Sequence, residues 1–488
     1  MWKKLLITGC VTFSLLSGGA LSAQPSCETK QEVTSEQLDK TQKGLVAMMK
    51  ELKNDSYFQT ELDKAASLST PSKQMEAYKN LASRLLSVLE IQAELEWMKP
   101  EAIQEALDIM KKSSGFDSAL ADKRFNELKS LLAGGFDGVY SCDQQAIDNA
   151  NKALVLKRKL LLMSPDVNVD KMLTVKFDLT GRANYVGAGS LGIQPNNWSN
   201  LSSASRNNFK AQLIELSGLK SGDLTEKVLY KPAVDGSSVT DLVLNWDGQR
   251  VMFTALDSTR RWQVHELNLD KGDTRQVTNI PEPDLEFFDG TYLPDGRMLA
   301  ISNIGYQGVP CVNGSDAVGN MVLYDPNNGD LRRLTFDQDA NWHPIVMANG
   351  KVMYVRWEYT DLTHYFSRIV MHMNPDGTEQ KSLYGSGSMF PNSIFDVQPL
   401  PKKTNRFVGV ISGHHGVARS GRLMIFDPAK SRKEEKGMIQ ELPFRGRPII
   451  PEIKDELVNG VWPQFIKPYP LTDETYLVTA KLSPYSRW

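Results

Sequence analysis

The sequence predicts an α+β chain of more than one domain, with an N-terminal helical bundle followed by a mainly antiparallel β-propeller of about six blades. Three observations predict this class. Two short phrases built around glycine turns recur at a regular period in the middle of the chain. Helical periodicity stops near residue 163, and strand-like runs begin near Met172. The chain has 488 residues, which is enough for two or three domains with full cores.

The first repeated phrase is an apolar run, an Asp-Gly or Asn-Gly turn, a polar or basic residue and a second apolar run. Its turn glycines are Gly248, Gly296 and Gly350, which are 48 and then 54 residues apart. A second phrase alternates with the first and recurs after 57 and then 48 residues. A period of this length holds about four strands and is typical of propeller blades.

Residues 28–165 read as a domain of five or six helices, with apolar residues at helical spacing. Thr34 and Gln37 form a capping box at the start of the first helix. Thr70 is an N-cap followed by Pro71 at the first helical position. We interpret the charges of this domain as solvated helix faces.

Residues 171–488 read as the propeller domain, with room for five to six blades. Its strand-like runs are short and bounded by Gly, Pro, Asp or Asn. They are Leu173–Phe177, Leu213–Leu216, Leu242–Leu244, Val251–Phe253, Val264–Leu267, Met298–Ile301, Met321–Tyr324, Val352–Val355, Ile369–His372, Phe407–Ile411, Leu423–Phe426 and Tyr476–Ala480. The last blade is incomplete at Trp488. Either residues near 172–232 complete the ring, or the sequence is a fragment of a longer protein, which we favour.

Residues 1–23 read as a secretory signal peptide. Lys3 and Lys4 give a positive start, an apolar run to Leu21 follows, and small residues favour cleavage after Ala23. A lipoprotein cleavage box at Cys10 is the minority interpretation, because the apolar stretch before it is short. No other stretch approaches the roughly 20 apolar residues of a membrane span. We therefore expect a soluble mature protein that is periplasmic or secreted.

The charge balance and the cysteines narrow the function classes. The net charge is −2, which argues against a nucleic-acid-binding protein. Cys27, Cys142 and Cys311 remain after cleavage, in a compartment that permits disulfides. Cys27 and Cys142 bracket the helical region, so we predict a bridge between them, with Cys311 left over.

Three catalytic or cofactor motifs are weak or missing. Gly187–Gly192 matches G-x-G-x-x-G, but the residues after it do not start a helix, so a dinucleotide loop is disfavoured. The sequence contains no G-x-S-x-G, which argues against a serine hydrolase elbow. It also contains no C-x-x-C-H haem attachment motif.

A metal site is the one constellation that we predict. Cys311 lies in an insert of one blade and His343 at the start of the next, and equivalent points of neighbouring blades converge around a propeller axis. Asp289 and either Asp337 or Asp339 would add oxygen ligands, and this donor set suits Zn²⁺. The alternative is that Cys311 is a small buried side chain, the histidines are hydrogen-bonded loop residues and the aspartates cap turns.

Residues 153–488 resemble secreted bacterial proteins that carry the middle domain of the hydrazine synthase alpha subunit. The resemblance is carried by phrases in one order, which include Ile280-Pro-Glu-Pro-Asp284, Gly308-Val-Pro-Cys311, Arg333-Leu-Thr-Phe-Asp-Gln-Asp339, Asn341-Trp342, Arg356-Trp-Glu-Tyr359, Ser412-Gly-His-His-Gly416 and Pro468-Tyr-Pro-Leu471. It implies a six-bladed propeller, and it places Cys311 and His343 where the family has a zinc beside a haem. Because the haem attachment motif is missing, the family's nitrogen chemistry is not carried over.

These observations leave three function classes. The leading one is an extracytoplasmic binding or scaffold protein that bears a metal and belongs to a redox system. The alternative is a subunit or fragment of a haem-dependent oxidoreductase resembling the hydrazine synthase alpha subunit. A propeller attached to a hydrolase domain, as in oligopeptidases, is disfavoured by the resemblance. The sequence assigns no catalytic residue, substrate or partner.

Overall fold

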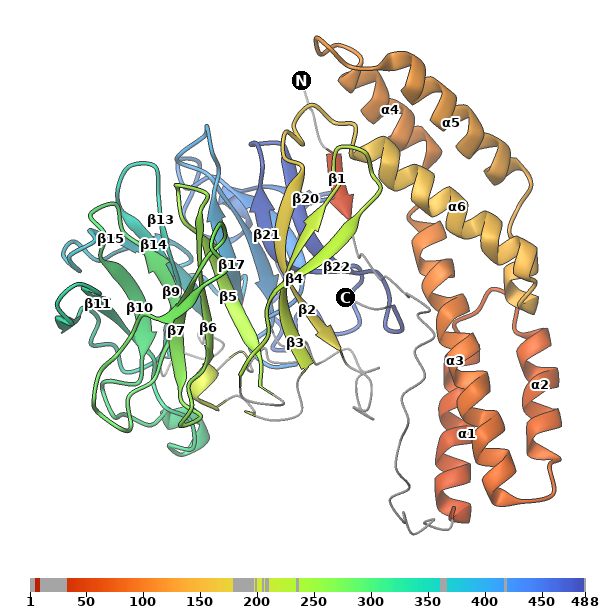
Figure 1. The fold of residues 1–488 in the computed structure, drawn as a ribbon, viewed down its shortest axis with the longest axis horizontal. Helices are drawn as coiled ribbons and strands as arrows, with labels where there is room; N and C mark the ends of the chain where they lie inside the picture. Colours follow the sequence, from red (N-terminus) through yellow and green to blue (C-terminus); the bar gives the residue numbers. More distant parts are fainter. Residues whose placement is uncertain are drawn as a thin grey trace. The chain divides into compact units, whose positions relative to one another are not determined.

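The computed structural model describes residues 5–8, 33–178, 197, 200–203, 206, 210–233, 237–359, 367–416 and 419–486. The chain forms two compact units. One unit is Ser164–Ala480 together with the N-terminal strand, and the other is the helical region up to Met163 together with Lys481–Trp488. Figure 1 shows the helices in red to yellow and the strands mainly in green to blue.

Six α-helices and one 3₁₀ helix make up the described part of the helical unit. They are α1 (Ser35–Met49), α2 (Ser56–Ala66), α3 (Pro71–Glu96), α4 (Pro100–Met110), α5 (Ser118–Ala133), η1 (Asp137–Ser141) and α6 (Gln144–Leu161). The capping box at Thr34 and the N-cap at Thr70 are both present. Phe58, Leu85 and Leu107 are fully buried, so the core lies along the apolar faces of these helices.

The second unit consists of strands and short 3₁₀ turns. The first sheets contain β2 (Lys171–Asp178), β3 (Lys210–Ser217), β4 (Thr225–Tyr230), β5 (Val239–Leu244), β6 (Arg250–Leu256), β7 (Trp262–Asn268) and β8 (Thr274–Gln276). The next are β9 (Phe287–Tyr292), β10 (Met298–Ser302), β11 (Asn320–Tyr324), β12 (Leu331–Arg333), β13 (Asn341–Val346), β14 (Val352–Trp357), β15 (Arg368–Met373) and β16 (Lys381–Tyr384). The last are β17 (Ser393–Pro399), β18 (Phe407–Ser412), β19 (Arg422–Phe426), β20 (Met438–Leu442), β21 (Gln464–Pro470) and β22 (Thr475–Lys481). The short turns are η2 (Leu201–Ser203), η3 (Pro310–Val312) and η4 (Glu434–Gly437).

Four successive groups of four strands are antiparallel meanders, which begin with β5, β9, β13 and β17. β2, β3 and β4 form a three-stranded sheet before them. One parallel residue pair, Arg368 with Ser393, links the third and fourth meanders into one larger sheet. β21 and β22 follow, and β1 (Leu5–Thr8) pairs parallel with β22. Since β1 lies inside the predicted signal peptide, cleavage after Ala23 would remove this partner of β22.

The first strands of successive sheets are neighbours in space. β5, β9, β13, β17 and β21 contact one another in chain order, and β2 contacts β5. Meanders whose first strands lie together have the arrangement of propeller blades. Apolar side chains such as Trp342 and Phe395 fill the space between neighbouring sheets, and both are almost completely buried.

The coarse fold class is confirmed: a helical N-terminal region precedes many antiparallel sheets. All twelve strand-like runs predicted from the sequence lie inside strands. No helix among the described residues is long and apolar enough to cross a membrane. Cys27 and the Gly187–Gly192 motif lie outside the described residues, so the bridge to Cys142 stays a prediction.

Gly421 provides a test of the close packing between sheets. It exchanges backbone hydrogen bonds with Phe465, which joins the fourth meander to β21. A Cβ at this position would lie 1.9 Å from the carbonyl oxygen of Ile411. We expect Gly421→Ala to lower the free energy of unfolding of this unit by about 3 kcal/mol, because the backbone must move apart.

Denaturant unfolding with a probe for β structure measures this loss. Gly44→Ala in α1 is the matched control, because its Cβ meets nothing within 4 Å. Alanine should raise the stability of that helix by up to about 1 kcal/mol. Equal stability of Gly421→Ala and wild type would contradict the close approach.

Candidate functional site

Five consecutive first strands each place an ionisable residue at the same kind of backbone position. These residues are Asp241 on β5, Asp289 on β9, His343 on β13, Asp396 on β17 and Lys467 on β21, and we call them the bulge cluster. All five have a left-handed backbone conformation, with φ of 55°, 56°, 53°, 48° and 47° in this order. In the first four strands the pairing with the next strand shifts register at this point. A bulge of this kind re-aims a side chain that regular alternation would send elsewhere.

Hydrogen bonds and ion pairs join neighbours in the bulge cluster across the sheets. The backbone N–H of His343 donates to Oδ2 of Asp289 at 2.5 Å, and the His343 Nδ1 lies 3.3 Å from Oδ1 of Asp289. On its other side, His343 Nε2 lies 3.3 Å from Oδ1 of Asp396. Lys467 Nζ lies 2.8 Å from the same oxygen, and the Lys467 N–H donates to Oδ2 of Asp396. These contacts link β9, β13, β17 and β21 in order.

The paired carboxyl groups are held in the charged form. Burial alone would raise the pKa of Asp289, but the charge and hydrogen bonds of His343, together with Lys467, lower it to about 2. Burial likewise opposes ionisation of Asp396, and Lys467 and His343 lower its pKa below the usual range. The neighbouring carboxylates raise the pKa of Lys467 against the effect of burial.

Asp241 differs from the other two carboxyl groups. Burial and the negative charge of Asp289 raise its pKa. Its Oδ2 is buried and makes no hydrogen bond with any residue that the structure describes. Asp241 is therefore the acceptor of the cluster that is least engaged by the protein itself.

Arg419 lies against the cluster and supplies a further positive charge. Its guanidinium is 5.2 Å from the ring centre of Trp342 and 5.3 Å from that of Phe395. Burial lowers the pKa of Arg419 to about 10, while Asp289, Asp396 and Asp241 oppose that change. The side chains of Lys467 and His343 are 37% and 12% exposed, so solvent reaches the cluster.

The structure divides the predicted zinc ligands between two places. His343 and Asp289 meet in the bulge cluster. Cys311 and Asp339 both interact with the charge of Arg368, a buried residue of β15. Burial raises the pKa of Asp339 to about 6, against the effect of Arg368. The converging metal-ligating atoms in the described residues form a different group, so a zinc held by Cys311, His343, Asp289 and Asp339 stays a prediction.

Sequence reasoning missed Asp241, Asp396 and Lys467. A signal for this position exists in the repeat itself. Asp241, Asp289 and His343 each stand seven residues before the turn glycine of their sheet, since 248 − 241, 296 − 289 and 350 − 343 are all seven. An ionisable residue seven positions before the turn glycine therefore indicates the position of the bulge. Asp396 and Lys467 lie in later sheets with longer or different turns and do not follow this spacing.

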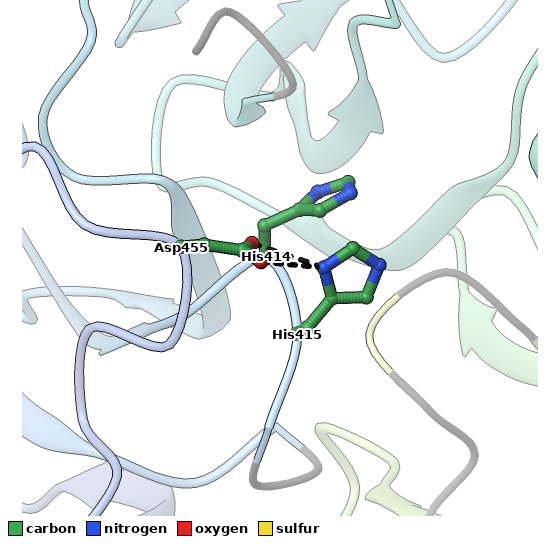
Figure 2. A group of neighbouring side chains, drawn as sticks. All are labelled: His414, His415 and Asp455. Carbon is green, nitrogen blue, oxygen red and sulfur yellow. Dashed lines mark hydrogen bonds and ion pairs between the residues drawn. The ribbon is translucent and has the colours of Figure 1, made fainter.

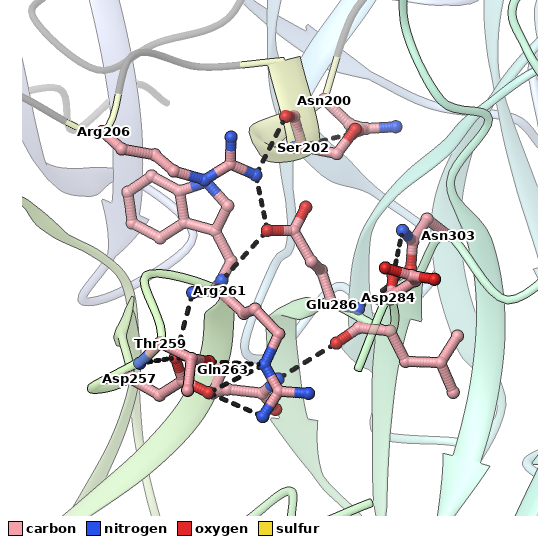
Figure 3. A network of polar contacts seen from close by, with 12 residues as sticks. Asn200, Ser202, Arg206, Asp257, Thr259, Arg261, Gln263, Asp284, Glu286 and Asn303 are labelled. Carbon is pink, nitrogen blue, oxygen red and sulfur yellow. Dashed lines mark hydrogen bonds and ion pairs between the residues drawn. The ribbon is translucent and has the colours of Figure 1, made fainter. Parts of the chain in front are cut away.

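A second polar network lies between β7 and β9 and includes Arg206 (Figure 3). Glu286 accepts from Arg206 at 2.5 Å and from the backbone N–H of Trp262 at 3.2 Å. Asp257 pairs with Arg261 at 2.9 Å. The network borders a hollow of about 460 Å³. These acidic and basic side chains pair with each other, so we interpret the network as a structural connection between the two neighbouring sheets.

No family model matches the chain, and no curated protein matches it. Among solved structures, the chain is similar to hydrazine synthase from Kuenenia stuttgartiensis, with a TM-score of 0.46 and 13% identity over 64% of this chain and 42% of that one. It is also similar to TolB from Acinetobacter baumannii, with a TM-score of 0.31 and 17% identity over 45% of this chain and 46% of that one. A third match is puromycin hydrolase, with a TM-score of 0.34 and 14% identity over 54% and 36%. The chain thus spans less than half of each of these proteins, and likeness at this level says nothing about activity.

The low pKa of Asp289 predicts a pH-dependent contribution to stability. A carboxyl whose pKa falls from about 3.9 unfolded to about 2 folded stabilises the folded state above pH 4, and this stability is lost as the pH falls toward 2. We therefore expect Asp289→Asn to cost on the order of 2 kcal/mol at pH 7. The difference from wild type should shrink below pH 4.

Urea unfolding at a series of pH values measures this difference. Asp270→Asn is the control, because Asp270 is an exposed turn residue. A constant difference between Asp289→Asn and wild type from pH 7 to pH 2 would show that the Asp289 charge adds no stability.

Proposed function

We propose that the chain is an extracytoplasmic binding protein built on a β-propeller of about six blades, and that it binds a small polar ligand at the bulge cluster. One observation carries this proposal: five consecutive first strands aim ionisable side chains toward one another from equivalent left-handed positions. Left-handed non-glycine residues are costly, and they persist where a surrounding structure demands them, often at binding sites.

The order of the strands supports the propeller. β2, β5, β9, β13, β17 and β21 are neighbours in chain order and could serve as six inner strands. A ring of sheets has only short, protected edges, which is the advantage of closure. The apolar run and small residues before Gln24 support export of the chain by a signal peptide.

The balance of charges favours a ligand of low net charge. The carboxyl groups of Asp241, Asp289 and Asp396 face the cations Lys467 and Arg419 and the imidazole of His343. The cluster thus sets three carboxyl groups against two cations and one imidazole. It offers both hydrogen-bond donors and acceptors within a few ångströms, which suits a small zwitterion such as a free amino acid.

A purely structural role accounts for the ion pairs of Asp289, Asp396 and Lys467 but not for Asp241. Asp241 adds no ion pair within hydrogen-bond distance to the cluster, so its burial gains little for the fold. A ligand group that donates to Asp241 would supply the missing interaction.

Binding of a metal ion and association with a redox system are secondary proposals. The predicted Zn²⁺ would find His343 and Asp289 together, while Cys311 and Asp339 lie beside Arg368. The haem-dependent alternative also stays a prediction. A C-x-x-C-H motif encoded in the same reading frame after Trp488 would support it.

Binding of free amino acids provides the test. At a concentration of one hundred times Kd, a ligand stabilises the folded state by about 2.7 kcal/mol. We expect at least one amino acid to raise the Tm of the wild-type protein, as measured by differential scanning fluorimetry across all of the common amino acids. Lys467→Met and Asp241→Asn should lose this response, because each removes one of the groups that would contact the ligand.

Lys381→Met is the matched control, because Lys381 is exposed on β16 and should keep the full response. If no amino acid raises the wild-type Tm, or if Lys467→Met responds as the wild type does, the proposed binding function is wrong.

A further inference from the structure

The geometry points to a binding site for a divalent transition-metal ion, such as Zn²⁺, formed by His414, His415 and Asp455. The two histidines follow β18, and Asp455 lies in the long connection between β20 and β21. One ligand atom from each residue lies within 4.8 Å of the others. Figure 2 shows the Asp455 carboxylate facing the His415 ring, with the His414 ring beside them. This site goes beyond the binding function proposed above and does not depend on it.

His415 and Asp455 already have nearly the spacing of two ligands on one ion. The His415 Nδ1 lies 3.0 Å and 2.8 Å from the two carboxylate oxygens of Asp455. Zn²⁺ binds imidazole nitrogen and carboxylate oxygen at about 2.0–2.2 Å, so two tetrahedral ligands stand roughly 3.3 Å apart. The ion would take the place of the proton between them, and that proton would pass to solvent.

The chain turn brings two consecutive histidines to the same side. In a strand, neighbouring side chains point to opposite faces, but the chain bends at residues 414–416. As a result the rings of His414 and His415 meet edge to face, with their centres 4.2 Å apart. Two imidazoles and one carboxylate form a donor set that zinc sites commonly use, with further positions left for solvent or a ligand.

The backbone around these residues is held on several sides. A Cβ on Gly413 would lie 2.7 Å from the carbonyl oxygen of Asp455, so only glycine permits this approach. The His414 N–H donates to the same carbonyl at 2.8 Å. Asn197 and Ser393 donate to the carbonyl of Gly413 at 2.7 Å and 3.0 Å. Ligands that are fixed by such contacts lose little entropy on binding an ion.

His415 and Asp455 should contribute more than His414 to binding the metal ion. His414 is 4% exposed, and its Nδ1 contacts the guanidinium of Arg368. Because arginine only donates, Nδ1 must accept, and the other ring nitrogen of the neutral imidazole then carries the hydrogen. His414 can therefore bind the ion only after its contact with Arg368 is broken. The side chains of His415 and Asp455 are 42% and 54% exposed, so an ion can reach them from solvent. We therefore assign the main ligand roles to His415 and Asp455.

Titration of the full chain with Zn²⁺ by isothermal calorimetry tests the site. His415→Ala and Asp455→Asn should each weaken the tightest Zn²⁺ binding at least tenfold, and His414→Ala should weaken it less. His372→Ala is the matched control, since it removes a histidine of β15 and should leave the affinity unchanged. Zn²⁺ should also raise the Tm of the wild type and of His372→Ala but not of His415→Ala, which separates loss of the ion from loss of folding.

Unchanged Zn²⁺ affinity in both His415→Ala and Asp455→Asn would overturn the inference. So would a loss of binding in His343→Ala and Cys311→Ala alone, because the ion would then belong to the set predicted from the sequence. The amino-acid response of the bulge cluster is read separately, so either proposal can fail while the other holds.

Discussion

The ion pairs that run from Asp289 through His343 and Asp396 to Lys467 are the constraint on which the sheet unit depends. They connect four first strands, and no two of these strands are paired with each other in the sheets of the described residues. Asp289 and Asp396 lie largely out of water, so their negative charges must be compensated by their neighbours. Removing one member leaves another charge buried and uncompensated. The free energy of unfolding should then fall by more than one surface ion pair contributes. The left-handed bulges bring these charges into contact.

Stacked aromatic and guanidinium groups connect the bulge cluster to the candidate metal site. Arg419 lies over Trp342, the ring of Trp342 stacks on Trp357 at 6.5 Å, and Trp357 lies 4.4 Å under the guanidinium of Arg368. Arg368 in turn contacts His414. The two polar sites are therefore linked through a packed stack of aromatic rings and two guanidinium groups, and the charge of Arg419 acts on Arg368.

The sequence predicted the second and third strands of each meander much better than most of the first strands, which form the site. Runs such as Val251–Phe253 and Met321–Tyr324 are uninterrupted apolar segments, and all of them are strands. β9, β13 and β17 were not recognised as strands, because a charged residue followed by Gly, Pro or Val interrupts the apolar pattern at the bulge. The interruption is the bulge itself, so a rule that seeks regular alternation does not recognise these strands. Helix starts at Thr34 and Thr70 were predicted correctly, since capping depends on local chemistry alone.

A double-mutant cycle on His343 and Asp396 is the most direct measurement of the coupling between sheets. The free energies of unfolding of His343→Ala, Asp396→Ala, the double variant and the wild type give the interaction energy of the pair. If the bulge cluster joins the sheets, the coupling should exceed about 1 kcal/mol and be favourable. A coupling within about 0.5 kcal/mol of zero would mean that the two residues act independently, and the bulge cluster could not then be the interaction that holds the first strands together.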